Sequence, residues 1–147
     1  MTRRQVSVTR TIAATPEQIF ELLADPTRHP LLDGSGTVTA AREDNPERLE
    51  LGSTFGMNMK MGARYRITNT VVEYEKNHLI AWRHFGGHRW RWRLEPAADG
   101  RTTVTETFDW STARVPFLIE LAGYPARNKA GIVATLDRLA GMFPEQG

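Results

Sequence analysis

The chain has 147 residues, and its 19 Lys and Arg against 17 Asp and Glu leave a formal net charge of only +2, which argues against a polyanion as the main partner. This length predicts one domain, residues 1–147, large enough to bury a core and a cavity. The chain contains no cysteine, which excludes disulfides and thiolate chemistry. It also lacks a signal-peptide core and any apolar run of about 18 residues, so we expect a cytoplasmic protein without a membrane span.

The N-terminal part of the sequence predicts one strand followed by two short helices. Residues 5–12 alternate apolar and polar side chains, which is the period of a strand. Thr15 and Gln18 have the spacing of a capping box, which predicts a helix that begins after Thr15 and ends near Asp25. A second short helix is predicted over residues 26–32.

From residue 52 onward the apolar pattern has a period of two, which predicts successive antiparallel strands with short connections. Including a weaker candidate before residue 52, strands are predicted over residues 37–42, 52–61, 65–71, 79–84, 88–94 and 101–110. The last element, Tyr124–Met142, has the period of a helix. Its predicted apolar stripe consists of Ile132, Leu136, Leu139 and Phe143, widened by Val133 and Ala140.

The turn around Gly86 and Gly87 decides which side chains face the helix. A two-residue loop pairs Phe85 with His88, whereas a three-residue loop pairs Phe85 with Arg89, and a shift of one residue exchanges the two faces. We favour the second register because it gathers the tryptophans on one face and the arginines on the other. It places Ile80, Trp82, His84, Trp90, Trp92 and Leu94 inside and Arg83, Arg89, Arg91 and Arg93 outside.

Besides the order of elements, six short segments have sequences that are similar to those of a known family. They are Ala13–Pro26, Leu51–Phe55, Leu79–Trp82, Leu94–Pro96, Thr103–Thr107 and Leu136–Leu139. The chain resembles the START-like (SRPBCC) superfamily, and in particular its polyketide cyclase/dehydrase-like branch. The resemblance implies an α+β helix-grip fold over residues 1–147, in which a curved antiparallel sheet of about six or seven strands wraps around the C-terminal helix. It also implies an apolar cavity between sheet and helix. Such families include lipid binders, cyclases and co-chaperones, so the fold leaves the function open.

The inner faces of the predicted strands carry more aromatic and thioether surface than a packed core usually needs, and methionine adapts to varied guests. We therefore expect a pocket for a hydrophobic or aromatic small molecule, of lipid or polyketide type, although a filled core is the simpler alternative. The candidate ligand-binding residues are Met57, Met59, Tyr65, Trp82, Trp90, Trp92, Phe108, Tyr124, Asn128 and Ile132.

Glu106 is the most informative single residue, because its phase in the last strand points a carboxylate inward beside Val104 and Phe108. A buried carboxylate must be paired, hydrogen-bonded or protonated. With His84 as its partner it would form an acid–base pair, which predicts a cyclase or dehydratase-type enzyme. The alternatives are a purely structural role for Glu106 and a co-chaperone-like interaction module that uses the protein surface, so whether the chain is an enzyme stays open.

Several other functions are not indicated. His84 and His88 flank a turn and lack the further ligands that a metal site needs, and no cofactor fingerprint is present. His29 and His78 are interpreted as loop histidines. In residues 88–93 arginine and tryptophan alternate and face opposite sides, so stacking and phosphate contacts would not cooperate on a nucleic acid. The outer arginines fit an acidic protein partner or a second subunit of a homodimer.

Overall fold

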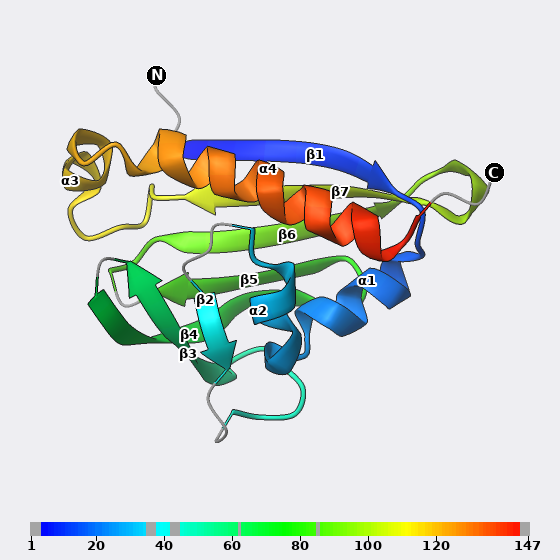
Figure 1. The fold of residues 1–147 in the computed structure, drawn as a ribbon, viewed down its shortest axis with the longest axis horizontal. Helices are drawn as coiled ribbons and strands as arrows, with labels where there is room; N and C mark the ends of the chain where they lie inside the picture. The colour runs from blue at the N-terminus through cyan, green and yellow to red at the C-terminus, as the bar shows by residue number, and fades with distance from the viewer. Residues whose placement is uncertain (1–3, 35–37, 42–44, 62, 85, 145–147) are drawn as a thin grey trace.

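The computed structural model describes residues 4–34, 38–41, 45–61, 63–84 and 86–144 (Figure 1). Its strands are β1 (Gln5–Ile12), β2 (Val38–Ala41), β3 (Thr54–Met61), β4 (Ala63–Glu75), β5 (Leu79–His84), β6 (Arg89–Pro96) and β7 (Thr102–Asp109). Its α-helices are α1 (Pro16–Leu23), α2 (His29–Leu32), α3 (Pro116–Leu121) and α4 (Tyr124–Met142), with short 3-10 helices η1 (Pro26–Arg28) and η2 (Ala98–Gly100).

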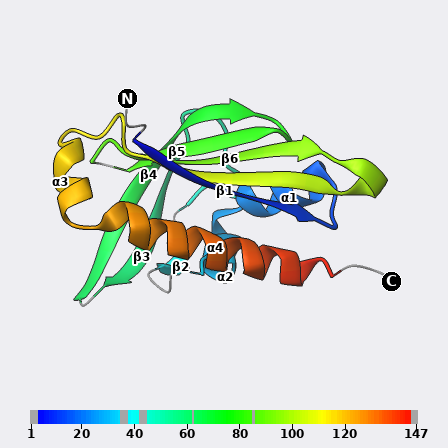
Figure 2. The ribbon, with the colours of Figure 1, turned by 90° about the horizontal axis from the view of Figure 1, so that it is seen from above.

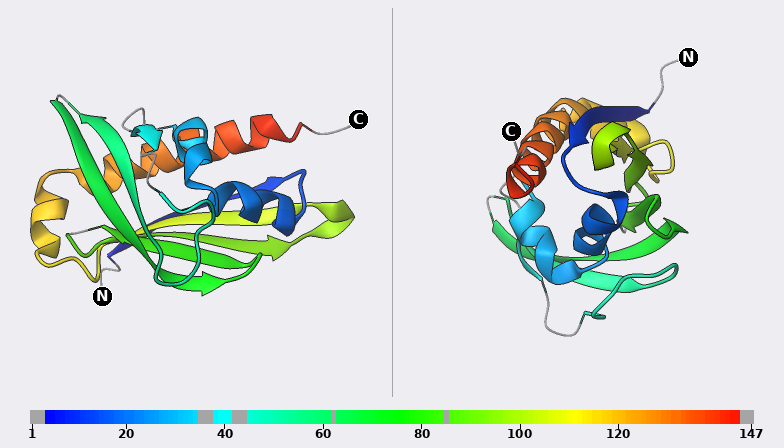
Figure 3. Two further views of the ribbon diagram at one scale, coloured as in Figure 1. Left: turned by 90° about the horizontal axis from the view of Figure 1, so that it is seen from below. Right: turned by 90° about the vertical axis from the view of Figure 1, so that its right-hand side faces the viewer.

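The strands form one antiparallel sheet in the order β1-β7-β6-β5-β4-β3-β2. Seen end on in Figure 3, this sheet curves around α1, and α4 lies along its open side. Helix α4 packs against β1 and β7 and runs along their length in Figure 2. This arrangement is the predicted α+β helix-grip fold, with seven strands in the described part of the chain.

Helix α1 begins at the position that the sequence predicts, because side-chain hydrogen bonds cap its first turn. The backbone N–H of Gln18 donates to the Thr15 hydroxyl at 3.2 Å, and the Thr15 N–H donates to the Gln18 side chain at 2.9 Å. These two bonds form the predicted capping box, which satisfies helix-end donors that have no partner within the helix. Ile19, Phe20 and Leu23 are then completely buried, so α1 closes one end of the core.

The long helix α4 has the predicted bounds, but its buried stripe is rotated slightly from the predicted one. Ile132 and Leu136 are each 1% exposed, whereas Val133 is 43% exposed, so Val133 does not widen the stripe. At 3.6 residues per turn Val133 lies about 100° away from Ile132. Thr135 takes the inner position instead, where its hydroxyl donates to the Gly131 carbonyl and accepts from the N–H of Gly34.

The β5–β6 hairpin has the predicted faces but not the predicted pairing. Trp82 lies opposite Trp90 and Ile80 opposite Trp92, while the N–H of His84 donates to the carbonyl of His88 at 3.0 Å. The pairing is thus shifted by two residues from the favoured register, which keeps every side chain on its predicted face. Phe85, on which the prediction was anchored, lies outside the described residues.

Helix α3 and the end of strand β4 differ from the sequence-based expectation, and the helix predicted over residues 26–32 is divided into η1 and α2. Helix α3 was not predicted, and it is linked to α4 by Gly123, whose φ of 75° is a conformation that glycine adopts without strain. In β4 a bulge between Val71 and Glu73 lets the strand continue to Glu75. After the bulge Tyr74, rather than Glu73, faces inward, and its ring contacts Phe20 edge-on. None of the helices in the described residues is long and apolar enough to cross a membrane.

Candidate ligand cavity

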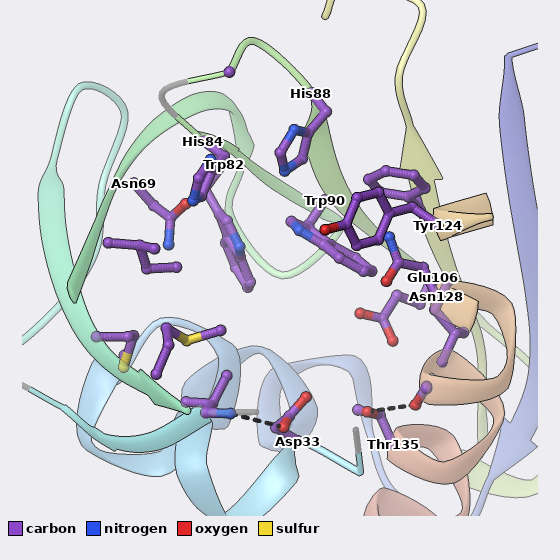
Figure 4. A pocket seen from close by; sticks show the side chains of 18 of the residues that line it. Asp33, Asn69, Trp82, His84, His88, Trp90, Glu106, Tyr124, Asn128 and Thr135 are labelled. Atoms are coloured by element: carbon purple, nitrogen blue, oxygen red, sulfur yellow. Dashed lines mark hydrogen bonds between the residues drawn. The ribbon is translucent and has the colours of Figure 1, made fainter. Parts of the chain in front are cut away.

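A cavity of about 730 Å³ lies between the concave face of the sheet and the helices α2, α3 and α4 (Figure 4). All twelve residues proposed from the sequence line it. They are Met57, Met59, Tyr65, Trp82, His84, Trp90, Trp92, Glu106, Phe108, Tyr124, Asn128 and Ile132. The inner face of the sheet is therefore not a completely filled core, and the binding roles of these residues stay a prediction.

Aromatic rings form one wall of the cavity. One of them belongs to His29, which was interpreted from the sequence as a loop histidine. His29 lies on α2, is buried, and stacks on Trp82 with ring centroids 4.9 Å apart. Phe55 contacts both rings edge-on. The His29 Nε2 lies 2.8 Å from the Leu23 carbonyl oxygen, and burial lowers the pKa of its imidazole. His29 is therefore a neutral wall residue and not a loop histidine.

Glu106 projects into the cavity from β7, directly opposite Trp92 on β6, as its phase predicts. Its side chain is 6% exposed, and its Oε1 atom has no hydrogen-bond partner among the described residues. Burial raises the pKa of this carboxyl group well above its ordinary value, and the nearby negative charge of Asp33 acts in the same direction. Glu106 is therefore suited to act as a neutral carboxylic acid.

His84 lies elsewhere in the cavity. Glu106 is level with Trp92 and, across the next strand, with Ile80. His84 follows Ile80 by four residues, which is about 13 Å along the strand. The two side chains that the sequence analysis joined as an acid–base pair are thus at different ends of the cavity, because alternation along a strand fixes the face of a residue but not its neighbours two strands away.

The end of the cavity that contains His84 is also polar. His84 lies opposite Asn69 on β4 and stacks on His88 with ring centroids 4.8 Å apart. Burial lowers the pKa of His84. Burial and the charge of His84 lower the pKa of His88 to about 4. Asn69 is 3% exposed. The alternation of residues along its strand was the one sequence pattern that indicated an inward-facing side chain.

Two further polar residues, which were not predicted from the sequence, line the cavity. Asp33 ends α2, and its carboxylate accepts a hydrogen bond from the backbone N–H of Val38 at 3.3 Å. Thr135 lies on α4. Neither residue shows a sequence pattern that predicts its position, because both positions depend on how the α2 region meets α4. In the described residues no three His, Asp or Glu side chains are placed to hold a metal ion.

Two of the arginines on the outer face of the sheet, Arg89 and Arg91, form ion pairs within the chain. Arg91 binds Glu73 through Nη2 at 2.7 Å and Asp109 at 3.2 Å, and Arg89 binds Glu73 at 3.0 Å. The hydrogen bond from Arg91 lowers the pKa of Glu73, as does the one from Arg89. Arg93 is exposed. The acidic partner or second subunit that these arginines suggested stays a prediction.

Comparison with other proteins agrees with this architecture. A family model described as polyketide cyclase/dehydrase and lipid transport matches residues 3–142. The uncharacterized protein Rv0088 of Mycobacterium tuberculosis is 41% identical over 144 residues, which cover 95% of this chain and 64% of that protein. A second M. tuberculosis sequence is 40% identical over the same lengths. The chain thus spans slightly less than two thirds of these curated relatives.

Solved structures share the fold at low sequence identity. Protein Ms6760 of Mycobacterium smegmatis has a TM-score of 0.70 at 14% identity, covering 95% of this chain and 90% of the other. An Aha1 dimer of Colwellia psychrerythraea has a TM-score of 0.65 at 17% identity, covering 97% and 96%. Protein NE0264 of Nitrosomonas europaea has a TM-score of 0.71 at 15% identity, covering 93% and 92%. At these identities the similarity concerns the fold alone.

Proposed function

The chain belongs to the polyketide cyclase/dehydrase and lipid transport family, and from this premise we propose that it binds a hydrophobic or aromatic small molecule, of lipid or polyketide type, between the sheet and α4. The observation that carries the proposal is the cavity of about 730 Å³ with walls of aromatic and thioether side chains. Its volume is typical of small-molecule sites, which are mostly apolar with a few placed polar groups. Trp82, Trp90 and Met57 supply the apolar contact, and the polar groups lie at the two ends.

The proposal is tested by native mass spectrometry of freshly purified protein together with titration by Nile red, an apolar fluorescent dye. We expect a retained apolar guest or saturable dye binding. Ile67 and Thr68 offer a matched pair of variants, because Ile67 lines the cavity and its neighbour Thr68 is exposed on the other face of β4. Ile67→Trp should fill part of the cavity and weaken dye binding, whereas Thr68→Trp should leave it unchanged. Equal effects of both variants would contradict binding in the cavity.

Catalysis on the bound molecule is a second candidate, and it rests on Glu106 alone. A neutral carboxylic acid inside an apolar cavity is suited to protonate a carbonyl oxygen of a bound ligand. His84 is about 13 Å away along the strand direction and does not complete the pair in this arrangement. Glu106→Gln keeps the volume of the side chain and removes the transferable proton. It should therefore abolish turnover of any substrate found by screening and keep the substrate bound, while pure binding would show no turnover in either protein.

A further inference from the structure

The charged residues that line the cavity differ sharply in their burial. Arg114 and Arg127 line it near α3 and the start of α4, and both are exposed. Glu106 is 6% exposed and lies on the sheet, and Asp33 faces the same space from the end of α2 (Figure 4). Among the arginine, aspartate and glutamate residues that line the cavity, the deeply buried one is therefore Glu106. Its charged neighbour, Asp33, is also an acid.

Two buried polar atoms at this end lack a partner among the described residues. One is Oε1 of Glu106, and the other is Nε1 of Trp92. These residues are directly opposite on β7 and β6, so their side chains share one face with Cβ atoms about 5 Å apart. A buried polar atom without a hydrogen bond is costly. One cross-strand pair thus leaves both an N–H donor and a carboxyl oxygen unsatisfied beside a cavity.

The surroundings of Glu106 favour its neutral form. No arginine, lysine or histidine in the described residues pairs with it, and burial and Asp33 both raise the pKa of its carboxyl group. A protonated carboxyl group both donates and accepts hydrogen bonds, whereas a carboxylate only accepts. The ligand group that best complements a protonated carboxyl group is a hydroxyl or carbonyl oxygen, because such a group has no charge that would need to be desolvated.

We propose that this end of the cavity recognises a neutral oxygen group, a hydroxyl or a ketone, on an otherwise apolar ligand, with Glu106 as the hydrogen-bond donor. This inference rests on the proposed function, since it assumes that the cavity holds a ligand. A ligand carboxylate is disfavoured because it would bring a third acidic group to Glu106 and Asp33. A ligand ammonium is disfavoured because it would leave the N–H of Trp92 without an acceptor and would itself lose its hydration among aromatic walls.

Four pyrene derivatives with one ring system test this selectivity. They are pyrene, 1-pyrenemethanol, 1-pyrenecarboxylate and 1-pyrenemethylammonium, titrated by fluorescence at pH 7. We expect 1-pyrenemethanol to bind about tenfold more tightly than pyrene, the effect of roughly one well-formed hydrogen bond, and the carboxylate to bind less tightly than pyrene. Tightest binding of the ammonium or of the carboxylate would overturn the proposal.

Three variants assign the effect to Glu106. Glu106→Leu should abolish the roughly tenfold preference for the alcohol while pyrene itself still binds. Glu106→Gln retains an N–H donor and should keep the preference. Glu95→Gln, an exposed acid on the neighbouring strand, is the control and should change nothing. An unchanged preference in Glu106→Leu would show that another group makes the hydrogen bond and would refute the assignment.

Dependence on pH supplies a test that does not need the leucine variant to fold. In the wild-type protein the preference for the alcohol should decline as the pH rises through the pKa of Glu106, whereas in Glu106→Gln it should stay constant. A constant preference in both proteins would refute the neutral acid as donor. If all four pyrenes bind with equal affinity, the cavity function stands and this inference fails. If none binds and no guest is retained, the proposed function fails as well.

Discussion

His84 and His88 stack across the β5–β6 turn, with ring centroids 4.8 Å apart and ring planes 18° apart. The backbone N–H of His84 donates to the carbonyl of His88, and the N–H of Gly87 donates to the carbonyl of His84. His88 also contacts the ring of Phe108 edge-on. Two imidazoles held this closely and partly buried cannot both become charged without a free-energy cost, so the turn couples the stability of the fold to pH.

The pKa of His88, lowered to about 4 by burial and by the charge of His84, makes a specific prediction. Between pH 6.5 and 4 the unfolded chain binds a proton at this histidine that the folded chain does not bind. The free energy of unfolding should therefore fall as the pH is lowered through this window, by at most about 3 kcal/mol for this one group. Urea unfolding at several pH values should show a smaller fall for His88→Phe than for the wild type. His78→Phe, at an exposed histidine, should behave like the wild type, and equal slopes in all three proteins would contradict the assignment.

Glu106 should produce a dependence of opposite sign. Its folded-state pKa is raised above the ordinary value of 4.5, so as the pH rises above about 4.5 the unfolded chain loses a proton that the folded chain keeps. The free energy of unfolding of the wild type should fall over this range up to the folded-state pKa. Glu106→Gln cannot titrate, and its stability relative to the wild type should increase with pH. Chemical unfolding between pH 5 and 8 measures this difference, and a difference that does not vary with pH would show an ordinary pKa.

Leu136 tests the packing of α4 on the sheet. It is 1% exposed, and Leu136→Ala should lower the free energy of unfolding by about 2–5 kcal/mol, because truncation of a buried leucine loses apolar contact and leaves a cavity. Val133→Ala on the exposed side of the same helix should change it by less than about 0.5 kcal/mol. Denaturant unfolding of the two variants compares these sites directly, and similar losses for both would mean that the helix packs in another rotation.

The ion-pair network on the outer face should contribute a moderate amount to stability. Glu73 receives hydrogen bonds from Arg89 and Arg91 and is only partly exposed. Glu73→Gln should cost about 1–2 kcal/mol, more than a fully exposed pair but less than a completely buried one. Glu95→Gln on the exposed surface should be neutral. The difference should shrink in 1 M salt, as expected for partly screened charges, and a loss no larger than that of Glu95→Gln would contradict a stabilising network.

Local patterns in the sequence determined much of the architecture. The capping box of Thr15 and Gln18 needs only residues three apart. The bounds of α4 follow from the helical period of its own side chains, and the inward face of Trp82, Trp90 and Trp92 follows from alternation along two strands. In each case the interacting groups belong to one element or to one hairpin, so their spacing along the chain is nearly their arrangement in space.

The tertiary structure decided which residues from different elements meet. A shift of two residues between β5 and β6 preserves every face, so the alternation that identified the inner tryptophans could not place His84 relative to Glu106. His29 stacks on Trp82, and Asp33 faces Glu106, only because α2 is folded under the curved sheet beside α4. These relationships depend on sheet curvature and helix docking, which arise from packing among residues far apart in the sequence, and no local period records them.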